Sequence, residues 1–296
     1  MAAGGGLPGT QVLAGNALRW LRAHFYRWGG PRFGLRDALL WFDAVDIWHR
    51  YTAIREALGE ALRAGVRILE VGPGWYGLEF FLPEDFDDTG LLVQLDVVPR
   101  PVRAERRSVR RVLASGWALP FNDRTFDVVV AADVLEHLPK DRRRTFAEEL
   151  KRVTRGSVLL HVPLENEDGT FQAASCDRSL QRWLRAVRGR EDSFLEEHLR
   201  HGHPTPAEIQ DYFPGALLTP TQSVREWSWY MKQERVPVAN LLTGLRSYLR
   251  GVSGRPPYYG GLHVWMRKEK GAIRRGISPP PGLVSETEND AARTSD

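Results

Sequence analysis

The sequence predicts an α/β fold in which a doubly wound, mostly parallel sheet carries helices on both faces. Three observations support this prediction. Short apolar segments recur between residues 67 and 163, an amphipathic helix separates the last two of them, and a glycine-rich turn follows the first. Strands that alternate with helices form parallel sheets, and these sheets bind ligands beyond the carboxyl ends of their strands.

Five predicted strands are short apolar segments bounded by polar or turn-forming residues. They cover residues 67–71, 91–96, 110–115, 125–132 and 157–163. Between the last two, residues 141–154 carry Phe146, Leu150 and Val153 at the i, i+4, i+7 spacing of an amphipathic helix. This order of strand, helix and strand is typical of a parallel sheet.

Two further elements are predicted after residue 163. Thr205 and Glu208 have the spacing of a capping box around Pro206, so we expect a helix to start there. Residues 260–269, GGLHVWMRKE, follow the segment RPPYY and predict a late strand. We expect this strand to add to the sheet as an antiparallel edge strand.

The chain divides into three segments. Residues 1–64 are predicted to begin disordered and to continue, over 16–64, as an N-terminal helical segment that caps the fold. Residues 65–270 form the predicted ligand-binding domain. Residues 271–296 have almost no apolar bulk, so we expect a disordered tail.

Composition and charge exclude several functional classes. The net charge of +4 is too weak to indicate nucleic-acid binding, although it suits an anionic substrate or a membrane surface, and peripheral membrane contact stays open. Cys176 is the only cysteine, which excludes an internal disulfide and a thiolate zinc site and is typical of a cytoplasmic protein. No apolar stretch is long enough to predict a membrane-spanning helix.

The turn after the first strand has the pattern G-x-G-x-x-G. Its glycines are Gly72, Gly74 and Gly77, and they allow a sharp turn and a close approach of ligand to backbone. Glu70 lies at the end of the first strand. Asp96 ends the second, where an acid can accept hydrogen bonds from both hydroxyls of a ribose. This arrangement suits NAD as well, so these residues alone do not exclude an NAD-dependent oxidoreductase.

Residues 115–138, SGWALPFNDRTFDVVVAADVLEHL, distinguish the possible cofactors. Because of this segment, the chain resembles the class I, Rossmann-like methyltransferases that depend on S-adenosylmethionine. The resemblance rests on the segment from Glu70 to Gly74, on Asp96, on ALPFNDRTFDVVV, and on VLEHL after the fourth strand. It covers residues 65–165 well and 166–270 loosely. It implies S-adenosylmethionine as the cofactor.

The resemblance also implies how the matching residues bind the methionine and ribose parts of the cofactor. Glu70, Gly72 and Gly74 would border the methionine part. Asp96 would bind the ribose, and Val97 would flank the adenine.

Four further residues are implied on the adenine and sulfonium sides. Gly116 and Trp117 would lie along the adenine ring, and Ala132 and Asp133 would face the sulfonium end. Many family members carry an aspartate where Ser115 and Gly116 stand. Its absence leaves contacts with the adenine amino group to the main chain.

Two sets of ionisable residues have a functional and a structural interpretation. Glu136 and His137 follow the fourth strand, near the position expected for the acceptor, and they are our candidates for catalysis. The alternative is that they pack at the start of a helix. His198, His201 and His203 lie close together, so a zinc site is conceivable. We expect them to be surface or substrate-loop residues, and we expect no metal.

The leading functional hypothesis is a methyltransferase that acts on a small molecule or on a glycan or lipid precursor. The alternatives are an NAD-dependent oxidoreductase and a non-catalytic scaffold that binds the cofactor. The acceptor needs a cover that excludes water. We expect the aromatic segment 16–50 and the loop 196–204 to supply it.

Overall fold

The computed structural model describes most of the chain between residues 45 and 267. The described residues are 45–59, 62, 65–74, 77–83, 85–99, 106–189, 191–233 and 255–267. The first part of the predicted helical segment and the predicted tail lie outside them. Within the described part, no helix combines the length and the apolar character that a membrane span requires.

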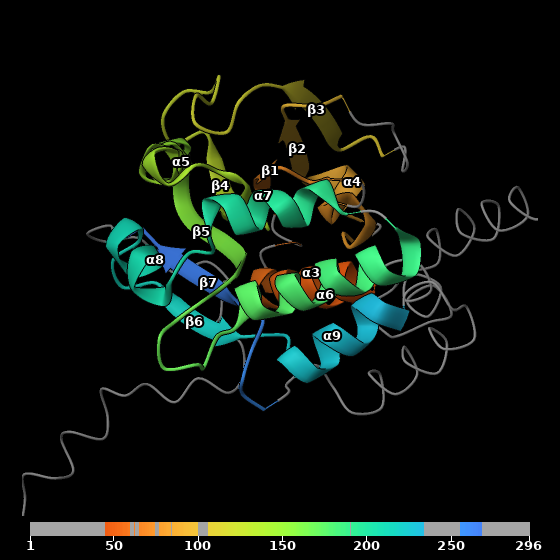
Figure 1. Cartoon of the computed structure of the whole chain (residues 1–296). Coiled ribbons are helices and arrows are strands. Elements are labelled where there is room, and N and C mark those ends of the chain that lie inside the picture. The colour runs from red at the N-terminus through yellow and green to blue at the C-terminus, as the bar shows by residue number, and fades with distance from the viewer. Residues whose placement is uncertain are drawn as a thin grey trace, which may run out of the picture.

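One seven-stranded sheet organises the fold, with strand order β3-β2-β1-β4-β5-β7-β6 (Figure 1). Its parallel strands are β1 (Arg67–Val71), β2 (Leu91–Asp96), β3 (Val109–Leu113), β4 (Phe126–Ala132) and β5 (Thr154–Pro163). The predicted strands 67–71 and 91–96 match β1 and β2 to the residue. The doubly wound, mostly parallel sheet is thus confirmed.

The late part of the sheet is antiparallel. β7 (Gly260–Met266) pairs antiparallel with β5, as the sequence predicts. On its other side β7 pairs antiparallel with β6 (Leu217–Pro220), which the sequence did not predict and which forms the edge. β6 is only four residues long and half-exposed, so it lacks the apolar pattern of a core strand.

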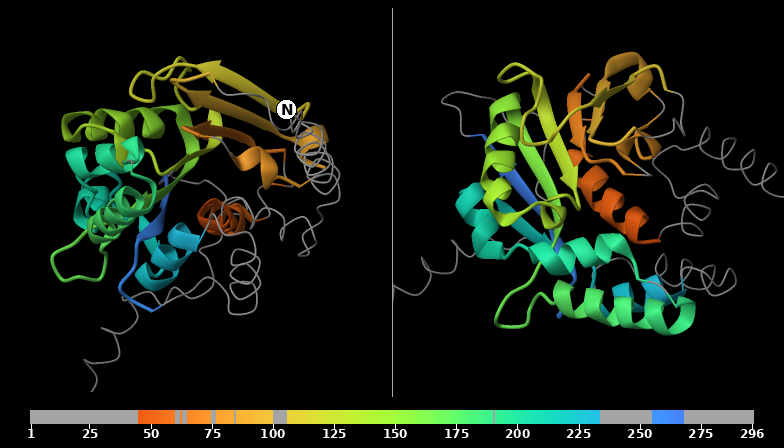
Figure 2. Two further views of the ribbon diagram at one scale, coloured as in Figure 1. Left: turned by 45° about the vertical axis from the view of Figure 1, so that its right-hand side comes forward. Right: turned by 45° about the horizontal axis from the view of Figure 1, so that its top comes forward.

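Helices cover both faces of the sheet (Figures 1 and 2). On one face α5 (Lys140–Val153) and α8 (Pro206–Tyr212) bury Phe146 and Ile209 against β1, β4 and β5. On the other face lie α3 (Val45–Leu58), the short 3₁₀ helix η2 (Leu78–Phe80) and α4 (Phe86–Thr89), which bury Tyr51 and Phe86. Successive strand residues alternate between these two cores, as the pleat requires.

Three more helices form a cap with its own apolar cluster. They are α6 (Ala173–Arg188), α7 (Ser193–His201) and α9 (Val224–Gln233). Cys176, Leu195 and Trp227 are buried in this cap against Tyr259, which precedes β7. α7 lies at the end of the sheet toward which β4 points and packs against η3 (Leu135–His137), which follows β4 (Figure 2).

The start of α8 confirms half of the predicted capping box. The Thr205 hydroxyl accepts a hydrogen bond from the Glu208 N–H at 3.0 Å. The Glu208 carboxylate does not return to Thr205, so that half of the prediction is wrong. It accepts instead from the Tyr212 hydroxyl at 2.7 Å and from Arg143, because α5 brings a buried guanidinium alongside.

Candidate active site

The glycine turn after β1 requires glycine at its first position. Gly72 has φ +69°, and its N–H donates to the Leu95 carbonyl of β2 at 2.8 Å. A Cβ atom at Gly72 would lie 2.7 Å from Cγ2 of Val134, which follows β4. Both the backbone conformation and the lack of space exclude a side chain here.

Gly74 opens onto a pocket at the carboxyl ends of β1, β2 and β3. It has φ +62°, and a Cβ atom there would meet nothing within 4 Å. The pocket, of about 220 Å³, is lined by Gly74 and Asp96, by apolar residues that include Val98 and Leu113, and by the polar side chains of Glu79, Gln94 and Arg111. The structure therefore brings the predicted Gly74 and Asp96 to one cavity.

The predicted adenine side is an exposed apolar surface. Val97 after β2 is 62% exposed, Leu113 at the end of β3 is 62% exposed, and Trp117 is 37% exposed. Gly116 is needed for packing, because a Cβ atom there would lie 2.7 Å from Cε2 of Phe146. Exposed apolar side chains beside a pocket are suited to bind a flat ring. The sequence missed Leu113, although it ends a predicted strand.

Glu70 lies beneath the glycine turn rather than in the pocket. The residue is fully buried; its carboxylate accepts from the Tyr51 hydroxyl at 2.7 Å, the Leu78 N–H at 2.9 Å and the Gln94 amide at 2.7 Å. Burial, together with the charge of nearby Glu79, raises the pKa of Glu70 to about 7. Glu70 thus ties α3 and η2 to β1 and has no exposed atom with which to border the methionine part.

Asp133, directly after β4, is held by charged partners. It has φ +51°, which is uncommon for a residue other than glycine. Its carboxylate pairs with Arg50 of α3 at 2.5 Å and with His161 Nδ1 of β5 at 2.7 Å. Burial raises the pKa of Asp133, but the Arg50 charge and His161 outweigh it and lower that pKa to about 2. Ala132, the last residue of β4, is buried beside it.

η3 carries the two candidate catalytic residues. Glu136 is fully buried, and neither carboxylate oxygen has a hydrogen-bond partner among the described residues. Burial and then the Asp133 charge raise the pKa of Glu136 to about 8. Burial and His198 lower the pKa of His137. His137 Nδ1 lies 2.9 Å from a Glu197 oxygen, so α7 fixes the ring.

The three histidines that the sequence assigned to the surface or to a substrate loop differ in position. His198 and His201 lie on α7, and His198 is buried there, so the prediction is wrong for His198. His203 is buried in the segment between α7 and α8. Asp177 of α6 explains this: its carboxylate meets His198 Nδ1 at 2.7 Å and His203 Nε2 at 3.0 Å, and accepts from the Tyr259 hydroxyl at 3.1 Å.

Three residues of the site had not been identified from the sequence. Arg50 of α3 and His161 of β5 contact Asp133 at the end of β4, Asp177 of α6 contacts His198 of α7, and no local motif links the three. His161 carried the one readable signal, a polar residue inside the apolar strand SVLLHVP. A buried polar side chain needs a partner, which points to a network.

Two comparisons bear on the identity of this site. Residues 69–162 match the family model described as a methyltransferase domain, a range that contains both the glycine turn and η3. This part of the chain is a class I S-adenosylmethionine-dependent methyltransferase domain. Its cofactor is therefore S-adenosylmethionine, and the NAD-dependent alternative is set aside.

Relatives of the methyltransferase are distant. It is 26% identical over 231 residues to an uncharacterised methyltransferase of Mycobacteroides abscessus, a match that covers 68% of this chain and 82% of the relative. It is 30% identical over 105 residues to an uncharacterised protein of Methanocaldococcus jannaschii, a match that covers 36% of this chain and 43% of the relative. A similar solved structure is magnesium protoporphyrin IX methyltransferase from Synechocystis with bound S-adenosylhomocysteine. The match is 14% identical, covers 86% of this chain and 95% of that one, and has a TM-score of 0.43.

Proposed function

We propose that this methyltransferase transfers the methyl group to an oxygen or nitrogen atom of a small molecule or of a glycan or lipid precursor. The observation that carries the proposal is the cover over the segment after β4. The Arg50–Asp133 ion pair joins α3 to this segment, and the hydrogen bond from His137 to Glu197 joins α7 to it. Two covering helices favour a small acceptor over a folded macromolecule, because the acceptor has to enter beneath them.

The glycine-loop half of the site, formed by Gly72–Gly74, Asp96, Val97, Leu113, Gly116 and Trp117, fits the cofactor. Asp96 offers a carboxylate to the ribose hydroxyls, and the open space at Gly74 lets the methionine part approach the backbone. The exposed apolar side chains suit the adenine ring. Glu70 contributes by holding the turn in place from below.

The histidine half of the site, formed by Asp133, Glu136, His137 and His198, supplies groups for the acceptor. S-adenosylmethionine brings an electrophilic methyl group, so the protein has to align a nucleophile and exclude water. A hydroxyl or amine acceptor also has to lose a proton. Glu197 fixes Nδ1 of His137, so its Nε2 is the ring atom left to assist that step, directly or through a bound group.

The test follows a labelled methyl group. The full chain is incubated with methyl-labelled S-adenosylmethionine and a cell extract that has been separated into small-molecule and macromolecular fractions. We expect label in the small-molecule fraction, and calorimetry that detects S-adenosylhomocysteine but not NAD. Asp96→Ala is the control, because it removes the ribose carboxylate and leaves the histidine half intact. Label in macromolecules alone would overturn the acceptor class.

A further inference from the structure

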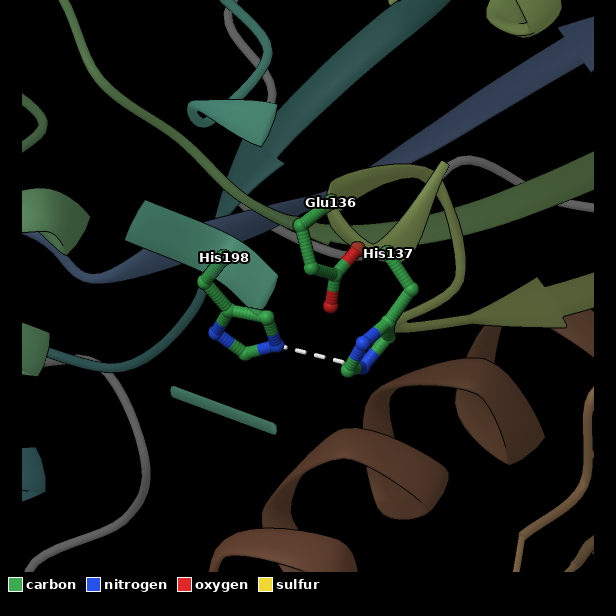
Figure 3. Close-up of side chains that lie close together, drawn as sticks. All are labelled: Glu136, His137 and His198. Atoms are coloured by element: carbon green, nitrogen blue, oxygen red, sulfur yellow. Dashed lines mark hydrogen bonds between the residues drawn. The ribbon is translucent and has the colours of Figure 1, made fainter. Parts of the chain in front are cut away.

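The rings of His137 and His198 meet in an unusual way (Figure 3). Their Nε2 atoms lie 3.1 Å apart. Each Nδ1 atom faces a carboxylate, Glu197 for His137 and Asp177 for His198, at 2.9 and 2.7 Å. A carboxylate accepts hydrogen bonds, so each Nδ1 carries the hydrogen and each Nε2 presents a lone pair. Two lone pairs at this distance repel each other unless a positive species lies between them.

Glu136 completes this arrangement. Figure 3 shows its carboxyl group directed toward the space beside the two rings. The residue is fully buried, and neither oxygen has a hydrogen-bond partner among the described residues. One oxygen of Glu136 and one nitrogen of each ring lie within 4.8 Å of one another. A proton shared by the two rings would leave both Glu136 oxygens without a partner, whereas a divalent cation would serve all three side chains.

The spacing agrees with the coordination of a transition metal. Two Zn–N bonds at a tetrahedral angle hold their nitrogen atoms about 3.3 Å apart, close to the 3.1 Å between the two Nε2 atoms. Metal-binding histidines commonly donate their other N–H to a carboxylate, which orients the ring. Glu197 and Asp177 occupy those outer positions.

We propose that Glu136, His137 and His198 bind one divalent transition-metal ion, Zn²⁺ or an ion of similar chemistry. This replaces the expectation from the sequence that the enzyme binds no metal. Three protein ligands are the number found at catalytic zinc sites, where a fourth position takes water or substrate. The ion's role, which rests on the proposed function, is to bind the acceptor oxygen and lower the pKa of its hydroxyl group.

A second group of possible ligands nearby does not form this site. Asp177, His198 and His203 also lie close together and are all buried. The same Asp177 oxygen already faces His198 Nδ1 and His203 Nε2 at hydrogen-bond distance. These contacts satisfy the carboxylate, so Asp177 orients the metal ligand His198 rather than binding the ion.

Metal binding is tested on the full chain without a histidine tag. The protein is treated with a chelator, dialysed, and titrated with Zn²⁺ in a calorimeter and with Co²⁺ in a spectrophotometer. We expect one ion per chain, visible absorption typical of four-coordinate Co²⁺, and a melting temperature that rises with Zn²⁺. Glu136→Gln and His198→Asn should each lower the affinity at least 10-fold. His201→Asn, on the same helix but outside the cluster, should leave it unchanged.

Two results would overturn the proposal. The first is wild-type protein that takes up no stoichiometric ion, which would assign a shared proton to the ring pair. The second is equal affinity in Glu136→Gln and His201→Asn. If His198→Asn does not fold, the wild-type stoichiometry and Glu136→Gln decide. Calorimetry with S-adenosylhomocysteine on the same samples separates this outcome from failure of the proposed function, because cofactor binding does not involve the cluster.

Discussion

The two halves of the site differ in the groups that form them. The glycine-loop half is open and combines main chain, the half-buried Asp96 carboxylate and exposed apolar side chains, with Glu79, Gln94 and Arg111 also lining its pocket. The histidine half is largely buried and consists of ionisable side chains that contact one another across α3, β5, η3, α6 and α7. The first is specified by local backbone geometry, and the second by contacts between residues far apart in sequence.

This difference predicts how each half responds to substitution. In the glycine-loop half, a side chain such as Asp96 can be removed without opening the core, so ligand affinity changes more than stability. In the histidine half, each buried charge depends on its partners, and removing one leaves the other unsatisfied. Stability and chemistry are therefore linked there.

The largest expected effect comes from Gly72→Val. A side chain at Gly72 would collide with Val134, which directly precedes η3 and so links the glycine turn to the histidine half. The strained φ and the missing space oppose any side chain. We expect calorimetry to show at least ~100-fold weaker binding of S-adenosylhomocysteine, about 2.8 kcal/mol, with a lower melting temperature. Gly74→Ala, where a Cβ atom meets open space, should keep a melting temperature nearer the wild type. Normal affinity in Gly72→Val would show that the turn holds no cofactor.

His137→Ala should separate chemistry from cofactor binding. Groups that help the acceptor to lose its proton, directly or by binding a metal ion, contribute ~100-fold or more to turnover. We expect turnover to fall by about this factor, with the dissociation constant for S-adenosylhomocysteine changed less than about twofold, or under 0.5 kcal/mol. The measurement is turnover and cofactor affinity side by side. Unchanged turnover would return His137 to a packing role.

His263 makes stability depend on pH. This β7 residue is buried, and neither ring nitrogen has a partner among the described residues. Burial, and then the nearby His161, lower its pKa from 6.5 to about 4. The unfolded chain therefore takes up the proton first, and stability falls as the pH decreases from 6.5 toward 4. The expected loss at pH 5 is about 2 kcal/mol.

His263→Leu isolates this contribution. We expect urea denaturation at pH 7.5 to give nearly the wild-type free energy of unfolding or a higher one, because no hydrogen bond is lost. Between pH 7.5 and pH 5 the variant should lose about 2 kcal/mol less than the wild type. Parallel curves for the two proteins would contradict the lowered pKa.

Asp96→Ala is expected to have the smallest effect and the most local one. Losing the ribose hydrogen bonds should weaken S-adenosylhomocysteine binding at least ~10-fold, about 1.4 kcal/mol. The melting temperature should stay near the wild-type value, because Asp96 is half-buried at the end of β2. An unchanged dissociation constant would remove Asp96 from the cofactor site.

The same difference explains what the sequence could predict. β1 and β2 were predicted to the residue, because apolar segments there end at glycine or aspartate. The residues proposed for the cofactor follow such strands directly, so a local motif was enough to find Gly74 and Asp96, which line one pocket. Glu70 lies outside the pocket, since its contacts come from Tyr51 and Gln94, which no spacing connects to it.

The histidine half was harder to predict for a physical reason. His198 occupies a buried position on α7 that an apolar residue would usually fill, and Asp177, 21 residues earlier, makes that burial tolerable. When His198 is counted as a polar residue, the sequence pattern no longer shows the apolar face of this helix. The start of α7 did carry a readable signal: Asp192 caps it, accepting from the Phe194 N–H at 3.0 Å.

The place of β7 in the sheet has a consequence for how the chain folds during its synthesis. Among the described residues, β7 is the last strand in sequence, yet it lies between β5 and β6. In the described structure, β6 has no other strand to pair with. The ribosome synthesises Leu217–Pro220 well before Gly260–Met266. The segment of β6 therefore cannot form its sheet hydrogen bonds until β7 has left the ribosome. The five parallel strands can assemble earlier, and the edge of the sheet is the final part to form.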